Sequence, residues 1–219
     1  MIWNDHSKDF PDGSHGFLSA SQSAWVNDEY EDLEKRYLAR YAADVGTCVH
    51  AWAAAHIKNM VRVKNAAKDE LYLHLVEQGF PRNAFDIDNI FATTQLYVND
   101  SIQRRLRPEQ KLKYSELAKG TADAINYTEK TNRLIIHDLK TGNGPVTMRQ
   151  LLVYAAFFVL EYEDQIEDIK NMDIELRIYQ KGDYEEAHPT YEELSELIGI
   201  VKEKNEWAED IYAAGAAGR

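Results

Sequence analysis

An acidic and a basic side chain, Asp138 and Lys140, are separated by one residue and follow an apolar run at positions 134–136. The run is typical of a buried strand, where side chains at i and i+2 point to the same face. Asp138 and Lys140 therefore share a face, while Leu139 points to the other one. A carboxylate beside an ammonium group can bind a hard metal ion and orient a water molecule, or it can form an ordinary salt bridge.

A second aspartate, Asp123, is expected to face Asp138 across a hairpin. If residues 129–132 form the loop, Thr128 lies opposite Arg133, and counting outward places Asp123 opposite Asp138. Directly opposed carboxylates have Cβ atoms roughly 5 Å apart, and they destabilise a sheet unless a positive charge lies between them. The register therefore predicts a place for a cation.

A divalent cation between the two aspartates would explain why they are paired. Mg²⁺ and Mn²⁺ bind to one or two carboxylates and keep positions for water and phosphate. Lys140 could then activate the water and neutralise charge on phosphorus, which predicts phosphodiester hydrolysis. The same residues are also explained as exposed hairpin carboxylates beside a surface cation, and the three positions alone leave both interpretations open.

The surrounding sequence predicts helices that flank a mixed sheet, which is an α/β or α+β fold. Residues 18–107 have a mostly helical pattern, residues 108–182 hold short strands and a connecting helix, and residues 190–213 form an amphipathic helix. A chain of 219 residues with 44% hydrophobic residues can bury one sizeable core. We therefore expect a single domain over residues 1–219.

Two helix starts are predicted in the N-terminal half. Ser19 and Gln22 have the spacing of a capping box. Gly46 is expected to end one helix and Thr47 to cap the next, which would place His50 in its first turn.

Composition narrows the classes of function. The single cysteine, Cys48, excludes an internal disulfide framework and a cysteine-held metal cluster. The N-terminal residues lack the layout of a signal peptide, and the longest apolar run, at 151–160, is far shorter than the roughly 20 residues of a membrane span. We expect a cytoplasmic protein. A net charge of −12 disfavours a broadly basic nucleic-acid binder but permits a local basic groove or metal-assisted contact with phosphates.

Four motifs in order, GTCVHAW, GTADAI, DLKTGNG and RQLLVYA, make a more specific pattern than any one of them. Together they resemble the RecB-like branch of the PD-(D/E)XK nuclease superfamily, which includes phage exonucleases and CRISPR-associated exonucleases. The resemblance covers roughly residues 18–160. It implies a restriction-endonuclease-like core, with a mixed sheet flanked by helices.

The resemblance also implies a role for each motif residue. The metal ligands would be His50, Asp123, Asp138 and the carbonyl of Leu139. The catalytic residues would be Asp123, Asp138, Lys140, Gln150 and Tyr154. Gln150 and Tyr154 are four residues apart and would lie on one helix face.

The chain departs from many relatives of this type, because it lacks the four cysteines that hold their iron–sulfur cluster. We therefore expect Mg²⁺, or Mn²⁺ in its place, and no iron–sulfur cluster. An extra acid often assists in this superfamily, and Glu116 is the candidate, although it also reads as a solvent-facing strand residue. Two basic clusters could contact phosphates or simply be solvated: Lys58, Arg62, Lys64 and Lys68, and Arg104, Arg105, Arg107, Lys111 and Lys113.

The sequence thus predicts a metal-dependent DNA exonuclease of phage or mobile-element recombination, encoded by a phage and acting in the host cytoplasm. Two alternatives stay open: an accessory protein that keeps the fold and binds nucleic acid without cleaving it, and an endonuclease. The expected partners are DNA, a single-strand annealing or recombination protein, and further copies of the chain.

Overall fold

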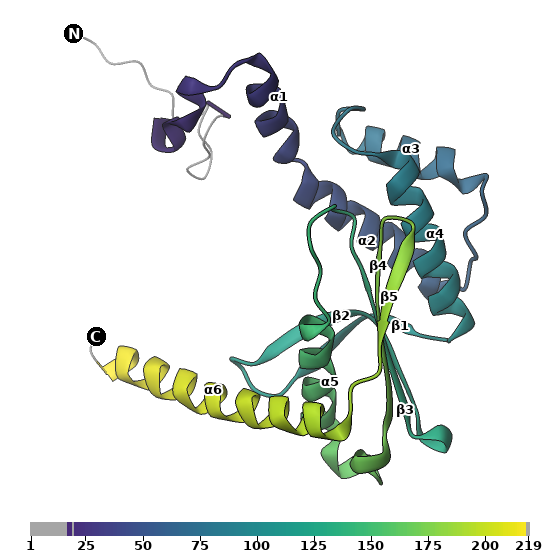
Figure 1. The fold of residues 1–219 in the computed structure, drawn as a ribbon, viewed down its shortest axis with the longest axis vertical. Helices are drawn as coiled ribbons and strands as arrows, with labels where there is room; N and C mark the ends of the chain where they lie inside the picture. The colour runs from purple at the N-terminus through teal and green to yellow at the C-terminus, as the bar shows by residue number, and fades with distance from the viewer. Residues whose placement is uncertain (1–16, 19, 218–219) are drawn as a thin grey trace.

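One mixed sheet forms the centre of the protein in a computed structural model that describes residues 17–18 and 20–217 (Figure 1). Among these residues, five strands pair in the order β1-β2-β3-β4-β5. Their bounds are β1 (Arg107–Lys113), β2 (Lys119–Thr128), β3 (Arg133–Leu139), β4 (Asp173–Gln180) and β5 (Asp183–Ala187). β3 and β4 are parallel, and the other neighbours are antiparallel. The α+β class predicted from the sequence is confirmed.

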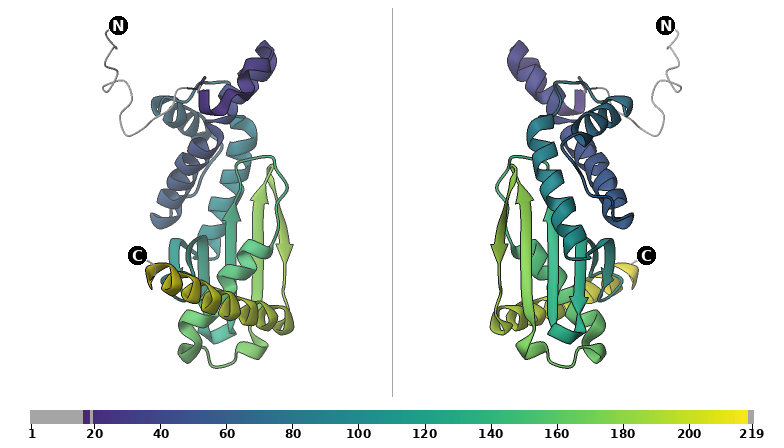
Figure 2. Two further views of the ribbon diagram at one scale, coloured as in Figure 1. Left: turned by 90° about the vertical axis from the view of Figure 1, so that its left-hand side faces the viewer. Right: turned by 90° about the vertical axis from the view of Figure 1, so that its right-hand side faces the viewer.

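Helices cover both faces of this sheet. They are α1 (Tyr30–Ala39), α2 (Ala42–Lys58), α3 (Ala67–Glu77), α4 (Ile87–Gln103), α5 (Arg149–Tyr162) and α6 (Tyr191–Ala217), and a 3-10 helix, η2 (Ala20–Asn27), precedes them. Figure 2 shows α4 against one face and α5 with α6 against the other. One apolar core joins α2, α3 and α4 to the sheet, and a second core joins α5 and α6 to it.

The central strand β3 serves both cores because its apolar run is continuous. Leu134 and Ile136 belong to the core under α5, and Ile135 and Leu139 belong to the core under α4. Strands that are covered on both faces have this composition, in contrast to the alternating pattern of half-exposed strands. The run that precedes Asp138 is therefore a central strand of the sheet.

Buried polar groups fix α4 against β4. Asp100 of α4 accepts hydrogen bonds from Arg177 and from the hydroxyl of Tyr179, both at 2.7 Å. Ser101 of α4 and Tyr179 also lie within hydrogen-bond distance of the fully buried His137. Because buried polar groups are costly without partners, these contacts hold α4 in one position on the sheet.

The hairpin register predicted from the sequence is confirmed. Thr128 pairs with Arg133, and a short 3-10 turn, η3 (Glu129–Thr131), closes the hairpin. Asn132 completes the turn with φ of +47°, a left-handed conformation that asparagine tolerates better than most residues. The last pair on the β2–β3 ladder is Ala124 with His137, so continuing the count places Asp123 opposite Asp138.

The predicted helix starts differ from the structure. Gly46 lies inside α2, and the hydroxyl of Thr47 donates to the carbonyl of Ala43 one turn earlier, so it is no cap. His50 is consequently in the middle of α2 and not in a first turn. The predicted capping box cannot be compared because Ser19 lies outside the described residues.

A connecting segment and an edge strand were not predicted. Residues 59–66 separate α2 from α3, and Met60 there has φ of +56°. β5 was missed because its sequence, DYEEA, is acidic and exposed, and edge strands of this kind lack an alternating apolar pattern. In the described part of the chain, no helix is both long and apolar enough to cross a membrane.

The two-sided burial of β3 predicts a large stability difference between two leucines. Leu134→Ala leaves a cavity in the core and should lower the free energy of unfolding by about 2–5 kcal/mol. Leu117→Ala, at an exposed leucine of the β1–β2 turn, should change it by less than about 0.5 kcal/mol. Urea denaturation followed by circular dichroism measures both, and equal losses would contradict this packing.

Candidate active site

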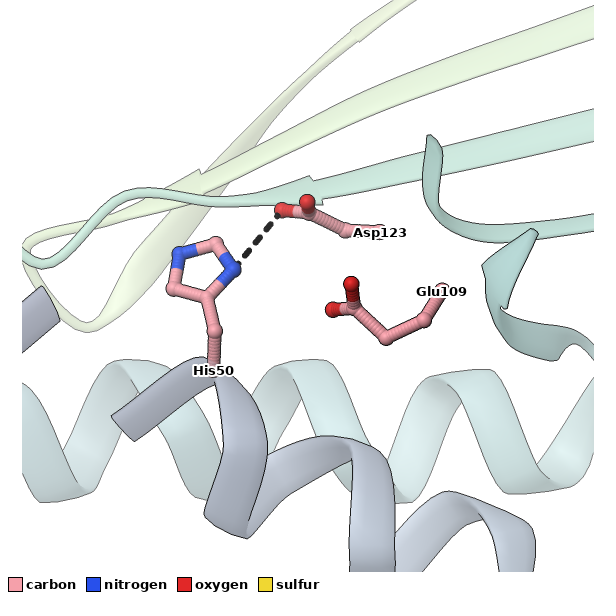
Figure 3. A group of neighbouring side chains, drawn as sticks. All are labelled: His50, Glu109 and Asp123. Atoms are coloured by element: carbon pink, nitrogen blue, oxygen red, sulfur yellow. Dashed lines mark ion pairs between the residues drawn. The ribbon is translucent and has the colours of Figure 1, made fainter. Parts of the chain in front are cut away.

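Three side chains from separate elements meet at the edge of the sheet. His50 of α2, Glu109 of β1 and Asp123 of β2 each offer one potential ligand atom, and these atoms lie within 4.8 Å of one another (Figure 3). The His50 Nδ1 atom is 3.3 Å from Asp123 Oδ2. Two carboxylates and an imidazole so close together form a donor set that a metal ion could bind.

A break in the β1–β2 pairing turns Asp123 toward His50. Ala122 packs in the core under α5, whereas Ala124 packs in the core under α4, although alternation would put both on one face. Pro108 pairs with Ala124 and Gln110 with Ala122, so Glu109 and Asp123 form the missing step of the ladder between them.

Glu109 has an unusual backbone at this break, with φ of +51°. This left-handed conformation is uncommon outside glycine and costs about 1–3 kcal/mol, and such strain concentrates at functional sites. Here it directs the Glu109 carboxylate to the cluster at the point where the ladder is interrupted. The strain is therefore an independent sign that this position matters for more than the fold.

Asp123 links the cluster to β3. Its Oδ2 atom accepts a hydrogen bond from the backbone N–H of Leu139 at 2.9 Å, in the region where the backbone ladder has ended. The carboxylate thus holds the end of β3 while it faces His50. This bond uses the backbone N–H of Leu139. That the carbonyl of Leu139 binds a metal ion stays a prediction.

Asp138 is buried, and its surroundings disfavour its charge. Burial, and after it the negative charge of Asp123, raise the pKa of Asp138 to about 6, while Lys140 and His50 act in the opposite direction. The Lys140 ammonium lies 3.1 Å from Oδ1 and 2.9 Å from Oδ2 of Asp138. Both oxygens of this buried carboxylate therefore face one ammonium group.

Burial and the neighbouring carboxylates also shift the pKa values of His50 and Glu109. Burial alone would lower the pKa of His50, but the hydrogen bond to Asp123 and the charges of Asp123, Asp138 and Glu109 outweigh it and raise this pKa. Partial burial, followed by the Asp123 charge, raises the pKa of Glu109. A bound divalent cation would relieve this repulsion, because it would place positive charge among the carboxylates.

Lys140 is held from two sides. Its ammonium donates to Asp138 and, at 3.1 Å, to Oε1 of Gln150 in the first turn of α5. Gln150 therefore contacts the predicted catalytic lysine directly. Sequence spacing suggested that Gln150 and Tyr154 share a face, but it did not predict this bond.

The loop between Lys140 and α5 is also fixed. Gln180, at the end of β4, donates to the carbonyls of Gly142 at 2.6 Å and Gly144 at 2.9 Å. Asn89 of α4 donates to the side chain of Asn143 at 3.2 Å. These bonds set the path of the loop and hence the spacing between Lys140 and Gln150, and the motif pattern gave no signal for Gln180.

Tyr154 packs against β2. A Cβ atom added to Gly120 would lie 2.9 Å from Cε1 of Tyr154, closer than real Cβ contacts. The glycine is therefore required by the tyrosine ring. Because Gly120 is three residues before Asp123, this contact helps to hold the strand that carries Asp123.

The additional acid that lies in the cluster is Glu109 and not the candidate Glu116. Glu116 is exposed in the β1–β2 turn, where it pairs with Lys113 and Lys119. Glu109 was not predicted because it belongs to none of the four motifs, although it lies on β1. Counting the β1–β2 register outward would have placed Glu109 opposite Asp123.

The two predicted basic clusters are partly engaged within the protein. Lys68 pairs with Asp88, and Arg104 pairs with the buried Glu175. Lys113 pairs with Glu116, as described above. These three cations are less suited to phosphate contact than the sequence suggested.

The fold and the site define an α+β protein with an acidic and imidazole cluster at an interrupted sheet edge, beside a paired aspartate and lysine. The family model described as "Protein of unknown function (DUF2800)" matches residues 6–218, and the chain belongs to this family. A comparison with curated proteins found no match.

The raised pKa of Asp138 predicts a pH-dependent stability. Between its ordinary pKa of 3.8 and the folded value of about 6, the folded chain binds a proton that the unfolded chain has released. The free energy of unfolding therefore falls as pH rises through this interval, by no more than about 3 kcal/mol from this group. Asp138→Asn should lack this component, so its stability relative to wild type should improve with rising pH.

Urea denaturation in EDTA across this pH interval measures the effect. Asp69→Asn, at an exposed position of α3, is the control and should follow the wild-type curve. A constant difference between wild type and Asp138→Asn across the interval would show that the Asp138 pKa is not raised.

The contact between Gly120 and Tyr154 predicts a rescue. Gly120→Ala should lower the free energy of unfolding by about 1–3 kcal/mol because the ring must move. The same change should cost clearly less in a Tyr154→Leu background, where the ring is absent. A double-mutant cycle by urea denaturation measures the coupling, and an equal cost in both backgrounds would refute the contact.

Proposed function

We propose that the chain is a Mg²⁺-dependent nuclease that hydrolyses phosphodiester bonds in DNA, acting as an exonuclease of the RecB-like PD-(D/E)XK type. The observation that carries this proposal is the convergence of His50, Glu109 and Asp123 within 4.8 Å, next to the Asp138–Lys140 pair. The motifs that suggested this chemistry in the sequence thus come from four different elements and meet at one place.

The ion would be held by His50, Asp123 and Asp138, as the resemblance implies, with Glu109 as an additional carboxylate. A bound Mg²⁺ or Mn²⁺ would neutralise phosphate charge and lower the pKa of a water molecule. Metal ligands must be deprotonated, and the pKa of Asp138 is raised to about 6. Protons and the metal ion therefore compete for Asp138, so the affinity for the ion should fall as pH is lowered through this value.

Lys140 would orient the attacking water and stabilise the charge that develops on the phosphate. Its ammonium is already fixed by Asp138 and Gln150, so little reorganisation is needed during the reaction. Gln150 then acts by positioning Lys140, and Tyr154 acts by positioning β2.

Asp138→Ala and Lys140→Ala should each reduce cleavage of linear DNA by at least about 10²-fold, the usual scale for removing a proton-transfer or electrostatic group. Glu116→Ala removes an exposed acid outside the cluster and should retain wild-type activity. The assay follows end-labelled linear and closed circular DNA, single- and double-stranded, with Mg²⁺ or EDTA.

Each outcome of this assay bears on a specific part of the proposal. Metal-dependent loss of label from linear DNA alone supports the exonuclease, and cutting of closed circles would replace it with an endonuclease. Full activity of folded Lys140→Ala would refute the assigned site. Metal binding without cleavage of any substrate would favour the nucleic-acid-binding accessory role.

A further inference from the structure

A half-open cavity of about 170 Å³ lies between β1, β2 and the C-terminal end of α5, apart from the cluster of acids. Its floor is apolar and includes Leu112, Ile125 and Phe158, which are buried. Tyr127 and Tyr162 flank Phe158, with ring centroids 5.4 Å and 5.1 Å from it. The cavity thus offers three aromatic rings to a ligand.

The rim of this cavity is polar in a specific way. Two amide side chains line it, those of Gln110 and Gln165, and each amide can both donate and accept hydrogen bonds. An apolar cavity of about 150 Å³ can hold benzene, so this one has room for a planar ring whose edge reaches the rim. A flat heterocycle with donors and acceptors along its edge, which is a nucleobase, matches both the floor and the rim.

Arg107 adds a positive charge to the cavity. It lines the cavity and is two residues before Glu109 on β1, while its ladder partner Ile125 is two residues after Asp123 on β2. Two strand residues span about 6.6 Å. Arg107 is exposed and has no ion-pair partner among the described residues, so its guanidinium is free to bind a phosphate.

Burial and the Glu161 charge raise the pKa of the Tyr162 hydroxyl, and the Arg107 charge opposes them. The positive charge of Arg107 therefore acts on Tyr162, which lines the cavity. Taken with the place of Arg107 in the cavity lining, this gives the cavity a phosphate-binding group beside its aromatic rings.

We propose that this cavity binds one unpaired nucleobase of the DNA strand, with an adjacent phosphate on Arg107. The proposal rests on the proposed nuclease function and adds the class of substrate. A base enters such a cavity only when it is unpaired and out of the stack. The preferred substrate is therefore single-stranded DNA or a duplex with a frayed end.

The test measures DNA binding in the Lys140→Ala background, so that cleavage does not interfere. The probes are a labelled single-stranded oligonucleotide and one of equal length with abasic residues in place of nucleosides. Gln165→Trp, at an exposed position of the rim, fills the cavity and should weaken binding of the intact strand at least about fivefold, without changing binding of the abasic strand. Gln78→Trp adds the same ring at an exposed amide of α3 and should change neither.

Two further measurements keep the test independent of how well Gln165→Trp folds. Arg107→Gln, at an exposed position, should weaken binding of both strands because it removes a phosphate contact. An oligonucleotide with 5-iododeoxyuridine should photo-crosslink to a peptide that contains Tyr127, Phe158 or Tyr162. The proposal would be overturned if the Lys140→Ala protein bound intact and abasic strands with equal affinity, or if crosslinks formed only with peptides outside the cavity.

Competition with thymidine monophosphate shows whether the cavity prefers a base within a DNA strand or a free nucleotide. Weak competition supports a base within a strand, and competition at the affinity of the oligonucleotide would overturn that reading in favour of a free nucleotide. Because binding is scored without cleavage, failure of this proposal is distinguishable from failure of the nuclease proposal. If the protein cleaves DNA but binds intact and abasic strands equally, only the proposed role of the cavity is refuted.

Discussion

Repulsion between partly buried carboxylates is the constraint on which the site depends. Glu109, Asp123 and Asp138 occupy successive positions across β1, β2 and β3, and burial together with the charge of Asp123 raises the pKa of Asp138 and of Glu109. The protein offsets part of this cost with His50 and Lys140. A divalent cation would offset the rest, since opposed carboxylates are stable only with positive charge between them.

The fold supplies the rigidity that this arrangement requires. β3 is packed between two apolar cores, so the end of the strand that carries Asp138 cannot shift without disturbing both. Bonds from Gln180 then fix the loop that leads to α5, and α5 returns Gln150 to Lys140. The β1–β2 ladder is interrupted at Glu109 and Asp123, and there the two carboxylates turn toward α2.

The sequence predicted the parts of this site that depend on local pattern. The β2–β3 register followed from loop length, and it placed Asp123 opposite Asp138 correctly. Glu109 was missed because its role depends on a left-handed backbone and an edge strand that starts earlier than its composition suggests. Gly46 was misread as a helix end because tertiary packing of α2 outweighs the low helix propensity of glycine. The cavity beside α5 depends on contacts between distant segments, which no single-sequence pattern reveals.

The central claim is that the acids bind a divalent cation, and calorimetric titration of the metal-free protein with Mn²⁺ and Mg²⁺ tests it most directly. The account predicts saturable binding to wild type, loss of that binding in Asp123→Asn, and wild-type binding in Glu116→Gln, whose acid lies in the exposed turn. Binding that is equal in wild type and Asp123→Asn, or absent from all three folded proteins, would contradict the account.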